Sequence, residues 1–335
     1  MQLKKLFAIG LAFTMMTTLL VGCSNKNDGA DNTSKDVYTI GMITDTGGVN
    51  DESFNQSTWE GLQKAEEKYG SDKVKVKYLE STKDADYVPN IETFVEEDLD
   101  LIIGVGYKTA DAIAEAAKNY PEKQFAVVDH AYEEQPENVT SLVYEDNTSS
   151  YLAGLIAGKM TETNKVAFIS GMESVVLNRF QYGYMAGVKA ANPDCEVVVR
   201  CANSFNDAAL GKSIANQMHK DGIDVIFTAA GAVGTGAIEA AKENGKMAIG
   251  VDTDQNALAP DNVISSAMKR VDIGVYDIIE KASKGEFEGG QVTVYGLKEG
   301  GVGIAPTTSK NVPKDVLDFV EAESQKIING EVTLK

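Results

Sequence analysis

A short stretch near residue 45 gathers side chains that suit the binding of a small polar molecule. It reads Asp45-Thr-Gly-Gly-Val-Asn50-Asp51-Glu-Ser-Phe54-Asn. Asp45 and Asp51 offer carboxylate acceptors. The paired glycines let backbone approach a ligand closely, and Phe54 offers a ring face for stacking. This combination favours a ligand that is polar and carries a ring.

The elements on either side place this stretch at a strand-to-helix corner. The apolar run at 38–43 predicts a buried parallel strand, and a helical pattern begins near Asp51. In a doubly wound sheet, ligands bind outside the carboxyl ends of the strands, beside the helix N-termini. The stretch therefore lies where such a fold binds its ligand.

A second corner of the same kind occurs later in the chain. Asn203-Ser-Phe205-Asn-Asp follows a predicted strand and precedes a predicted helix, and it repeats the Ser-Phe-Asn of the first corner. Phe54 and Phe205 could enclose a flat ring between them. Alternatively, each phenylalanine packs beneath the start of its own helix. The repetition favours binding.

Four further residues lie just after other predicted strands. Asp129 and Asp252 offer carboxylates that can accept from ribose hydroxyls or purine N–H groups, and Lys269 can donate to a sugar. Gly231 lets backbone approach a ligand. Alternatively, the carboxylates cap the next helices, which Asp does routinely. Because all four follow strand ends, we expect them to meet in one site.

From residue 37 onward, apolar β-rich runs alternate with longer helical patterns, which predicts an α/β fold with parallel sheets. The predicted strands lie at 38–43, 74–79, 100–105, 124–128, 139–144, 165–169, 195–200, 224–228, 247–251, 263–268 and 291–295. The predicted helices lie at 51–69, 86–97, 107–119, 146–160, 174–191, 207–220, 234–244, 271–284 and 314–329. The alternation restarts near 146, which indicates two similar halves in tandem.

Length and charge limit the function further. A chain of 335 residues is too long for one typical core and predicts about two domains. The formal net charge of −19 argues against nucleic acid as a partner, because its phosphates require clustered Lys and Arg. A neutral or cationic ligand is favoured.

The N-terminus has the form of a secretory signal, with Lys4 and Lys5 before an apolar run. Leu20-Val21-Gly22-Cys23 resembles the bacterial lipobox, which implies a signal peptide at 1–22 and lipidation of Cys23. Residues 23–36 then read as a lipidated cysteine and a flexible tether. We expect a protein anchored by its lipid to the extracytoplasmic face of the cell membrane.

Several enzyme and metal patterns are weak or missing. The glycine-rich pieces at 104–106 and 231–236 match neither a dinucleotide fingerprint nor a P-loop. His130 and His219 have no metal-ligand spacing around them, so we expect no metal, no cofactor and no catalytic residues. Cys195 and Cys201 flank a predicted strand, which would hold them about 20 Å apart, too far for a disulfide.

The motif at 45–56 closely resembles the signature of the basic membrane protein family, the purine nucleoside receptor lipoproteins. Weaker supporting motifs occur in the same order along 37–330, at Gly171-Met-Glu, 179–187, 203–207, 250–255 and 266–270. The resemblance implies a type I periplasmic-binding-protein fold, with two Rossmann-like lobes joined by three hinge crossings near Glu145, Asp254 and Gly289. Lobe 1 would comprise 37–144 plus 255–289, and lobe 2 would comprise 145–254 plus 290–335.

The resemblance also implies roles for the residues identified above. Phe54 and Phe205 would stack on the base, while Asp45, Asp129 and either Asp51 or Asn50 would bind its edge. The ribose would be held by Gly231, Asp252 and Lys269.

We therefore expect a monomeric lipoprotein that captures nucleosides, purine ones first, and delivers them to an ABC transporter permease without altering them. One alternative is a sugar or autoinducer receptor of the same fold, which binding assays with ribose, galactose and adenosine would separate. Others are a nucleoside hydrolase or glycosidase, detected by product release from inosine, and a surface adhesin or ligand sensor, for which the sequence carries no motif.

Overall fold

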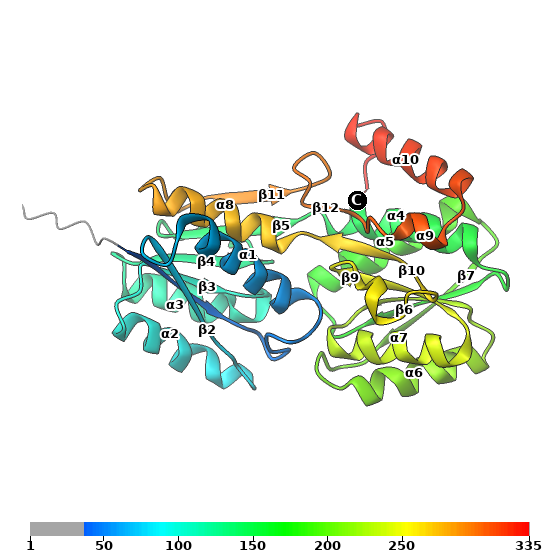
Figure 1. Cartoon of the computed structure of the whole chain (residues 1–335), viewed down its shortest axis with the longest axis horizontal. Helices are drawn as coiled ribbons and strands as arrows, with labels where there is room; N and C mark the ends of the chain where they lie inside the picture. The colour runs from blue at the N-terminus through cyan, green and yellow to red at the C-terminus, as the bar shows by residue number, and fades with distance from the viewer. Residues whose placement is uncertain (1–36, 335) are drawn as a thin grey trace, which may run out of the picture. The chain divides into compact units, whose positions relative to one another are not determined.

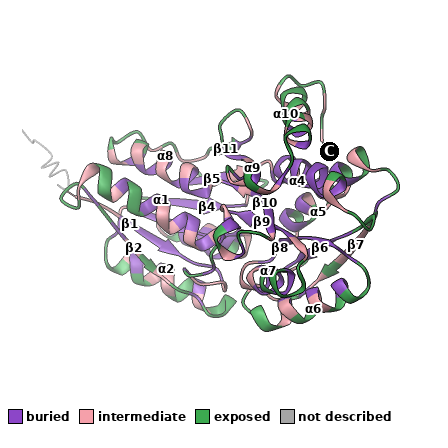
Figure 2. Ribbon diagram, turned by 45° about the vertical axis from the view of Figure 1, so that its right-hand side comes forward, coloured by how far each residue is buried: buried purple, intermediate pink, exposed green. Residues whose placement is uncertain are grey.

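Apolar residues fill both faces of most strands in this chain, as expected for parallel strands covered by helices on both sides. The computed structural model describes residues 37–334, and these form two α/β lobes, each built on one six-stranded sheet (Figure 1). The buried residues lie along the strands and on the inner faces of the helices, while the outer helix faces are exposed (Figure 2).

The first sheet is parallel throughout and has the order β11-β5-β4-β3-β1-β2. Its strands are β1 (Tyr38–Ile43), β2 (Val74–Leu79), β3 (Leu101–Gly104), β4 (Gln124–Val128), β5 (Val139–Tyr144) and β11 (Val292–Tyr295). Helices α1 (Phe54–Tyr69) and α8 (Val271–Ser283) cover one face, and α2 (Tyr87–Glu96) and α3 (Ala110–Asn119) cover the other. These elements form the first lobe.

The second sheet has the order β12-β10-β9-β8-β6-β7, and β12 is its single antiparallel strand. Its strands are β6 (Lys165–Ser170), β7 (Glu196–Cys201), β8 (Val225–Ala229), β9 (Met247–Asp252), β10 (Val263–Lys269) and β12 (Val302–Ile304). Helices α4 (Asp146–Met160), α5 (Val175–Ala191) and α10 (Lys314–Ile328) pack on one face, and α6 (Ala208–Lys220) and α7 (Ala232–Asn244) on the other. With the short α9 (Thr308–Asn311), these elements form the second lobe.

Both sheets repeat one topology, because β2-β1-β3-β4-β5 and β7-β6-β8-β9-β10 have the same order. In each lobe the direction of winding reverses beside the first strand, between β1 and β3 and between β6 and β8. A doubly wound sheet binds its ligand outside the carboxyl ends of the strands at such a switch point. The topology therefore indicates the loops after β1, β3, β6 and β8 as the place for a site.

The chain passes between the lobes three times, and two of the passages differ from their expected positions. The first lies at 144–146, and the others lie at 269–271 and 295–302 rather than near 254 and 289. As a result β10 belongs to the second sheet and β11 to the first, which corrects the expected division at 255–289 and 290–335. The reason is long-range pairing: β10 continues the parallel ladder of β9, and β11 that of β5.

Helices α4 and α5 approach each other unusually closely, and this contact fixes the wall that α5 presents to the first lobe. A Cβ on Gly154 would lie 2.2 Å from the carbonyl oxygen of Tyr184, and one on Gly187 would lie 2.0 Å from that of Tyr151. Any larger residue at either position would push the two backbones apart.

Each predicted strand and helix is confirmed, with ends that shift by up to about three residues. The sequence prediction omitted β12, α9 and three 3₁₀ turns at 84–86, 107–109 and 255–258. Cys195 and Cys201 are free thiols, which confirms that no disulfide joins them. Within 37–334, no helix has the length and apolar character needed to span a membrane.

Candidate functional site

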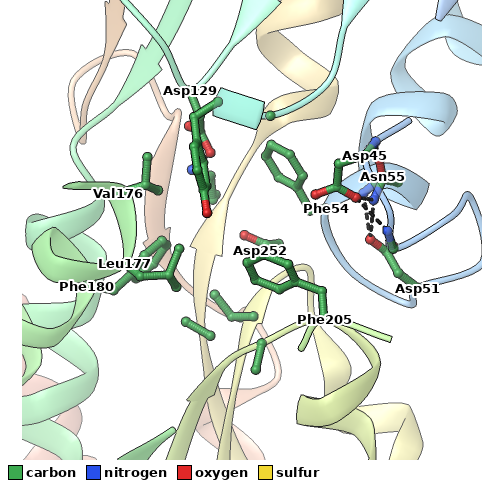
Figure 3. A pocket seen from close by; sticks show the side chains of 18 residues that line it. Asp45, Asp51, Phe54, Asn55, Asp129, Val176, Leu177, Phe180, Phe205 and Asp252 are labelled. Carbon is green, nitrogen blue, oxygen red and sulfur yellow. Dashed lines mark hydrogen bonds and ion pairs between the residues drawn. The ribbon is translucent and has the colours of Figure 1, made fainter. Parts of the chain in front are cut away.

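A cavity lies where the carboxyl ends of the two sheets meet, and Figure 3 shows the side chains that surround it. The space between its lining residues is about 560 Å³, which includes the part that is open to solvent. Its lining residues come from both lobes: Asp45, Gly47, Asp51, Phe54, Asn55, Gly106, Tyr107, Asp129, Val176, Leu177, Phe180, Phe205, Ala229, Ala230, Gly231, Val251, Asp252 and Lys269.

Eight of the nine residues proposed from the sequence as ligand contacts line this cavity. The exception is Asn50, whose side chain is exposed and does not line the cavity. Asn50 and Asp51 are adjacent, and the structure turns Asp51 inward, so Asn50 is the one predicted contact that the structure does not place at the cavity. The proposed lipidation residue, Cys23, lies outside the described residues.

Asp51 is buried, but its carboxylate is fully used within its own loop. Oδ1 accepts from the backbone N–H groups of Ser53 and Gln56, and Oδ2 accepts from the backbone N–H and the side-chain amide of Asn55. The backbone N–H groups of Asn55 and Gln56 are open donors in the first turn of α1, so Asp51 caps that helix from two residues before its N-cap, Ser53. A carboxylate that caps the next helix was the alternative to a binding role. For Asp51, the cap explains its contacts better than binding to the edge of a base.

Asp51→Ala is expected to lower the free energy of unfolding by about 2 kcal/mol, the upper end for loss of a helix cap, because four donors lose their acceptor. Urea denaturation of the purified protein measures this change. Asn50→Ala is the matched control, because the side chain of Asn50 lies next to Asp51 in the sequence but is exposed. We expect the control to change stability by less than about 0.5 kcal/mol; equal losses in the two variants would contradict the capping role.

Asp45 differs from Asp51 because one of its oxygens remains available to the cavity. Oδ1 accepts from the backbone N–H of Gly47, at 2.8 Å, and from the Asn55 amide, at 2.8 Å. Oδ2 accepts no hydrogen bond from the described residues. Burial raises the pKa of Asp45, and the hydrogen bonds from Asn55 and Gly47 oppose this shift. Asn55 thus orients both carboxylates, a role that the sequence pattern alone did not reveal.

Phe54 and Phe205 project into the cavity from opposite lobes, as Figure 3 shows. Each ring has a glycine beside it: a Cβ on Gly106 would lie 3.4 Å from Cε1 of Phe54, and one on Gly171 would lie 2.2 Å from Cε1 of Phe205. The space that a side chain would take at Gly171 is therefore filled by the Phe205 ring. Both phenylalanines are only half-buried, so part of each ring is left for a ligand.

Lys269 is the most deeply buried cation of the cavity, with a side chain 1% exposed. Its Nζ lies 2.5 Å from Oδ2 of Asp129 and 3.0 Å from Oδ1 of Asp146. Burial by itself would lower the pKa of this ammonium, but the carboxylates of Asp129, Asp146 and Asp252 outweigh burial, and the net shift is upward. Lys269 therefore stays charged and is shared among carboxylates.

The carboxylates around Lys269 are held at unusual backbone positions. Asp129 and Asp252 both have left-handed backbone, with φ of 66° and 64°. Such strain at a strand end commonly accompanies a functional site. Burial raises the pKa of Asp129 to about 6 and that of Asp252 to about 7, although Lys269 pulls both downward. Oδ1 of Asp129 is buried without a hydrogen-bond partner among the described residues.

The sequence prediction did not identify one wall of the cavity. Val176, Leu177 and Phe180 of α5 form an apolar surface there. Next to it, Arg179 holds Asp146 through Nε at 3.0 Å and Nη2 at 2.7 Å, and Asp146 in turn contacts Lys269. In a sequence, the apolar residues of a helix that face a cavity cannot be distinguished from those that face the core. Only the fold shows which of them face the other lobe.

Comparisons with known proteins agree with this architecture. Residues 38–335 match the model of the Bmp family, described as ABC transporter substrate-binding protein PnrA-like. The CD4+ T-cell-stimulating antigen of Listeria innocua is 42% identical, over 98% of each chain. The ABC transporter nucleoside-binding protein BmpA of Lactococcus lactis is 38% identical over 99% of each chain. Basic membrane protein A of Borreliella burgdorferi is 35% identical, over 96% of this chain and 94% of the relative.

Solved structures confirm the predicted type I periplasmic-binding-protein fold. An ABC transporter solute-binding protein from Aeropyrum pernix superposes with a TM-score of 0.82 at 29% identity, over 89% of this chain and 93% of that one. A solute-binding protein from Bacillus halodurans with bound myo-inositol superposes with a TM-score of 0.61 at 13% identity, over 86% and 99% of the two chains. At that identity the second similarity supports the fold alone.

Proposed function

The chain belongs to the Bmp family of PnrA-like ABC transporter substrate-binding proteins, and from this premise we propose that it captures nucleosides, with purine nucleosides preferred. The observation that carries the proposal is the pairing of Phe54 and Phe205 across a cavity whose remaining polar groups are mostly carboxylates. The name of the Lactococcus lactis relative, a nucleoside-binding protein, supports the same ligand class.

Each part of a nucleoside has a suitable partner in the cavity. The base would lie between Phe54 and Phe205, since aromatic rings stack on every kind of nucleic-acid base. Oδ2 of Asp45 would accept a hydrogen bond from the edge of the base. The ribose hydroxyls would then lie against the loop after β8 and the ends of β9 and β10, where Gly231, Asp252 and Lys269 line the cavity.

The charge of the cavity favours nucleosides over nucleotides. Asp45, Asp129 and Asp252 line the cavity together with one cation, Lys269, so a phosphate group would enter a site where carboxyl groups outnumber ammonium groups. Like charges brought together across a desolvated interface are costly. The uncharged sugar and base of a nucleoside avoid this cost.

We further propose that the protein is a monomeric lipoprotein, anchored through Cys23 on the extracytoplasmic face of the membrane, that delivers its ligand to an ABC permease. The lipobox at 20–23 and the membrane protein name of the Borreliella relative support the anchor. Closure of two lobes about three crossings would give the permease a surface that differs between empty and loaded protein. No chemistry on the ligand is proposed.

Calorimetric titration of the purified protein with guanosine, adenosine, inosine, cytidine and ribose tests the ligand class. Carried-over ligand is first removed by unfolding and refolding. We expect the purine nucleosides to bind more tightly than cytidine, because their larger rings offer more stacking area. Binding of ribose alone would replace the nucleoside proposal with that of a sugar receptor, and release of free base from inosine would indicate a hydrolase.

A further inference from the structure

Outside the cavity, two loops from opposite lobes are tied together by hydrogen bonds. The backbone carbonyl of Glu52, in the loop after β1, accepts from Nε2 of Gln255 at 2.9 Å and from Oγ1 of Thr253 at 3.2 Å. The next residue, Ser53, donates from Oγ to Oδ2 of Asp252 at 2.5 Å. None of Glu52, Ser53, Thr253 and Gln255 lines the cavity.

Gln255 is built into the second lobe so that its amide group faces the first. Its side chain is buried, and Oε1 accepts from the backbone N–H of Val251 at 3.0 Å. A Cβ on Gly250 would lie 2.4 Å from that same oxygen, so the absence of a side chain at 250 makes room for the amide. With Oε1 held within the second lobe, Nε2 points to the carbonyl of Glu52.

Glu52 contributes its backbone and not its carboxylate. Its φ of 54° is left-handed, an uncommon conformation for a residue with a side chain. Its side chain is exposed, whereas its carbonyl receives both donors. The loop is thus held in a strained conformation in which one carbonyl faces the other lobe, and such strain tends to persist where it serves a function.

From these contacts we propose that Thr253 and Gln255 form a closure latch that retains ligand without touching it. Neither loop belongs to the three passages at 144–146, 269–271 and 295–302, so the bonds form only when the lobes come together. The latch would set how long the closed state lasts, and so the rate of ligand release. This inference rests on the proposed capture of a ligand in the cavity, though not on which ligand it is.

Stopped-flow kinetics with inosine and adenosine test the latch on the full chain. Thr253→Val removes one donor with little change of shape, and Gln255→Glu keeps the acceptor for Val251 while removing the donor to Glu52. A hydrogen bond of ordinary net strength corresponds to roughly two- to twelvefold in an equilibrium constant. We expect each variant to release ligand about fivefold faster and to leave the association rate and the ratio of the two affinities unchanged.

Glu52→Gly is the matched control, because it removes the exposed side chain and retains the carbonyl, and its release rate should not increase. Unchanged release in both latch variants, or a changed ratio between inosine and adenosine, would overturn the proposal.

If neither nucleoside binds, the nucleoside assignment fails and the latch is tested without ligand. Fluorophores at the exposed positions Lys83 and Ala209, after the outer strands of the two sheets, report the distance between the lobes. We expect a smaller closed population in the latch variants. If variant and parent had the same closed population, the latch would also be overturned. This includes the case in which neither protein closes without ligand.

Discussion

Lys269→Met is expected to lower the free energy of unfolding by about 3–5 kcal/mol near neutral pH, the usual loss when one partner of a buried ion pair is removed. The side chain of Lys269 is 1% exposed, and those of its partners Asp129 and Asp146 are 6% and 0% exposed. Methionine preserves most of the volume but leaves the two carboxylates buried without this ammonium. Urea denaturation at about pH 8 measures the loss.

The loss should shrink as the pH falls, and the direction follows from the raised carboxyl pKa values. A folded-state pKa above the ordinary 3.8 gives a contribution to stability that is complete below about pH 4 and is lost as the pH rises through the folded value. That value is about 6 for Asp129 and about 7 for Asp252. Lys269 lowers both, so both pKa values rise further in the variant. At about pH 5 the carboxyl groups are then largely protonated and need the cation less.

Lys64→Met provides a matched control for the loss of a paired lysine. Lys64 contacts Oδ2 of Asp272 at 2.9 Å, but its side chain is 53% exposed. Solvent screens such a pair, so we expect a change below about 1 kcal/mol. A similar loss in both variants, or a loss for Lys269→Met that does not depend on pH, would contradict a buried charge network.

The alternation of elements was sufficient to predict the fold, whereas the pairing of the last strands was not. Runs such as 38–43 and 225–229 are apolar on both faces, which only a sheet covered on both sides accommodates. The strands β10 and β11 carry the same local pattern whichever sheet they join. Their assignment depends on β9 and β5 as neighbours, and the sequence near residues 263 and 292 does not contain that information.

For the candidate site too, some residues could be predicted from the sequence and others could not. The rule that ligands bind at strand ends was enough to find Asp45, Asp129, Asp252 and Lys269, because chain order fixes which residue follows a strand. It could not separate Asn50 from Asp51, since a one-residue change in a loop reverses which side chain turns inward. The apolar wall of α5 could not be predicted from the sequence either, because residues facing a cavity and residues facing the core have the same hydrophobic period.

Phe54→Ala is expected to weaken the binding of purine nucleosides roughly 5- to 150-fold, which corresponds to the 1–3 kcal/mol typical of a base stacked on an aromatic ring. Phe205→Ala should have a similar effect, because the two rings enter the same cavity from opposite lobes. Calorimetric titration with adenosine, inosine and guanosine measures both. The loss should be similar for the three nucleosides, since stacking depends little on the groups at the edge of the base.

Tyr182→Ala controls for the loss of an aromatic ring as such, because Tyr182 is 58% exposed and does not line the cavity. Its affinity for nucleosides should equal that of the parent. Thermal unfolding of all three variants separates lost binding from lost structure, since Phe54 also packs against the core of the first lobe. If Phe54→Ala remained folded and bound adenosine as tightly as the parent, Phe54 would be only a packing residue beneath α1, and the base would have to lie elsewhere in the cavity.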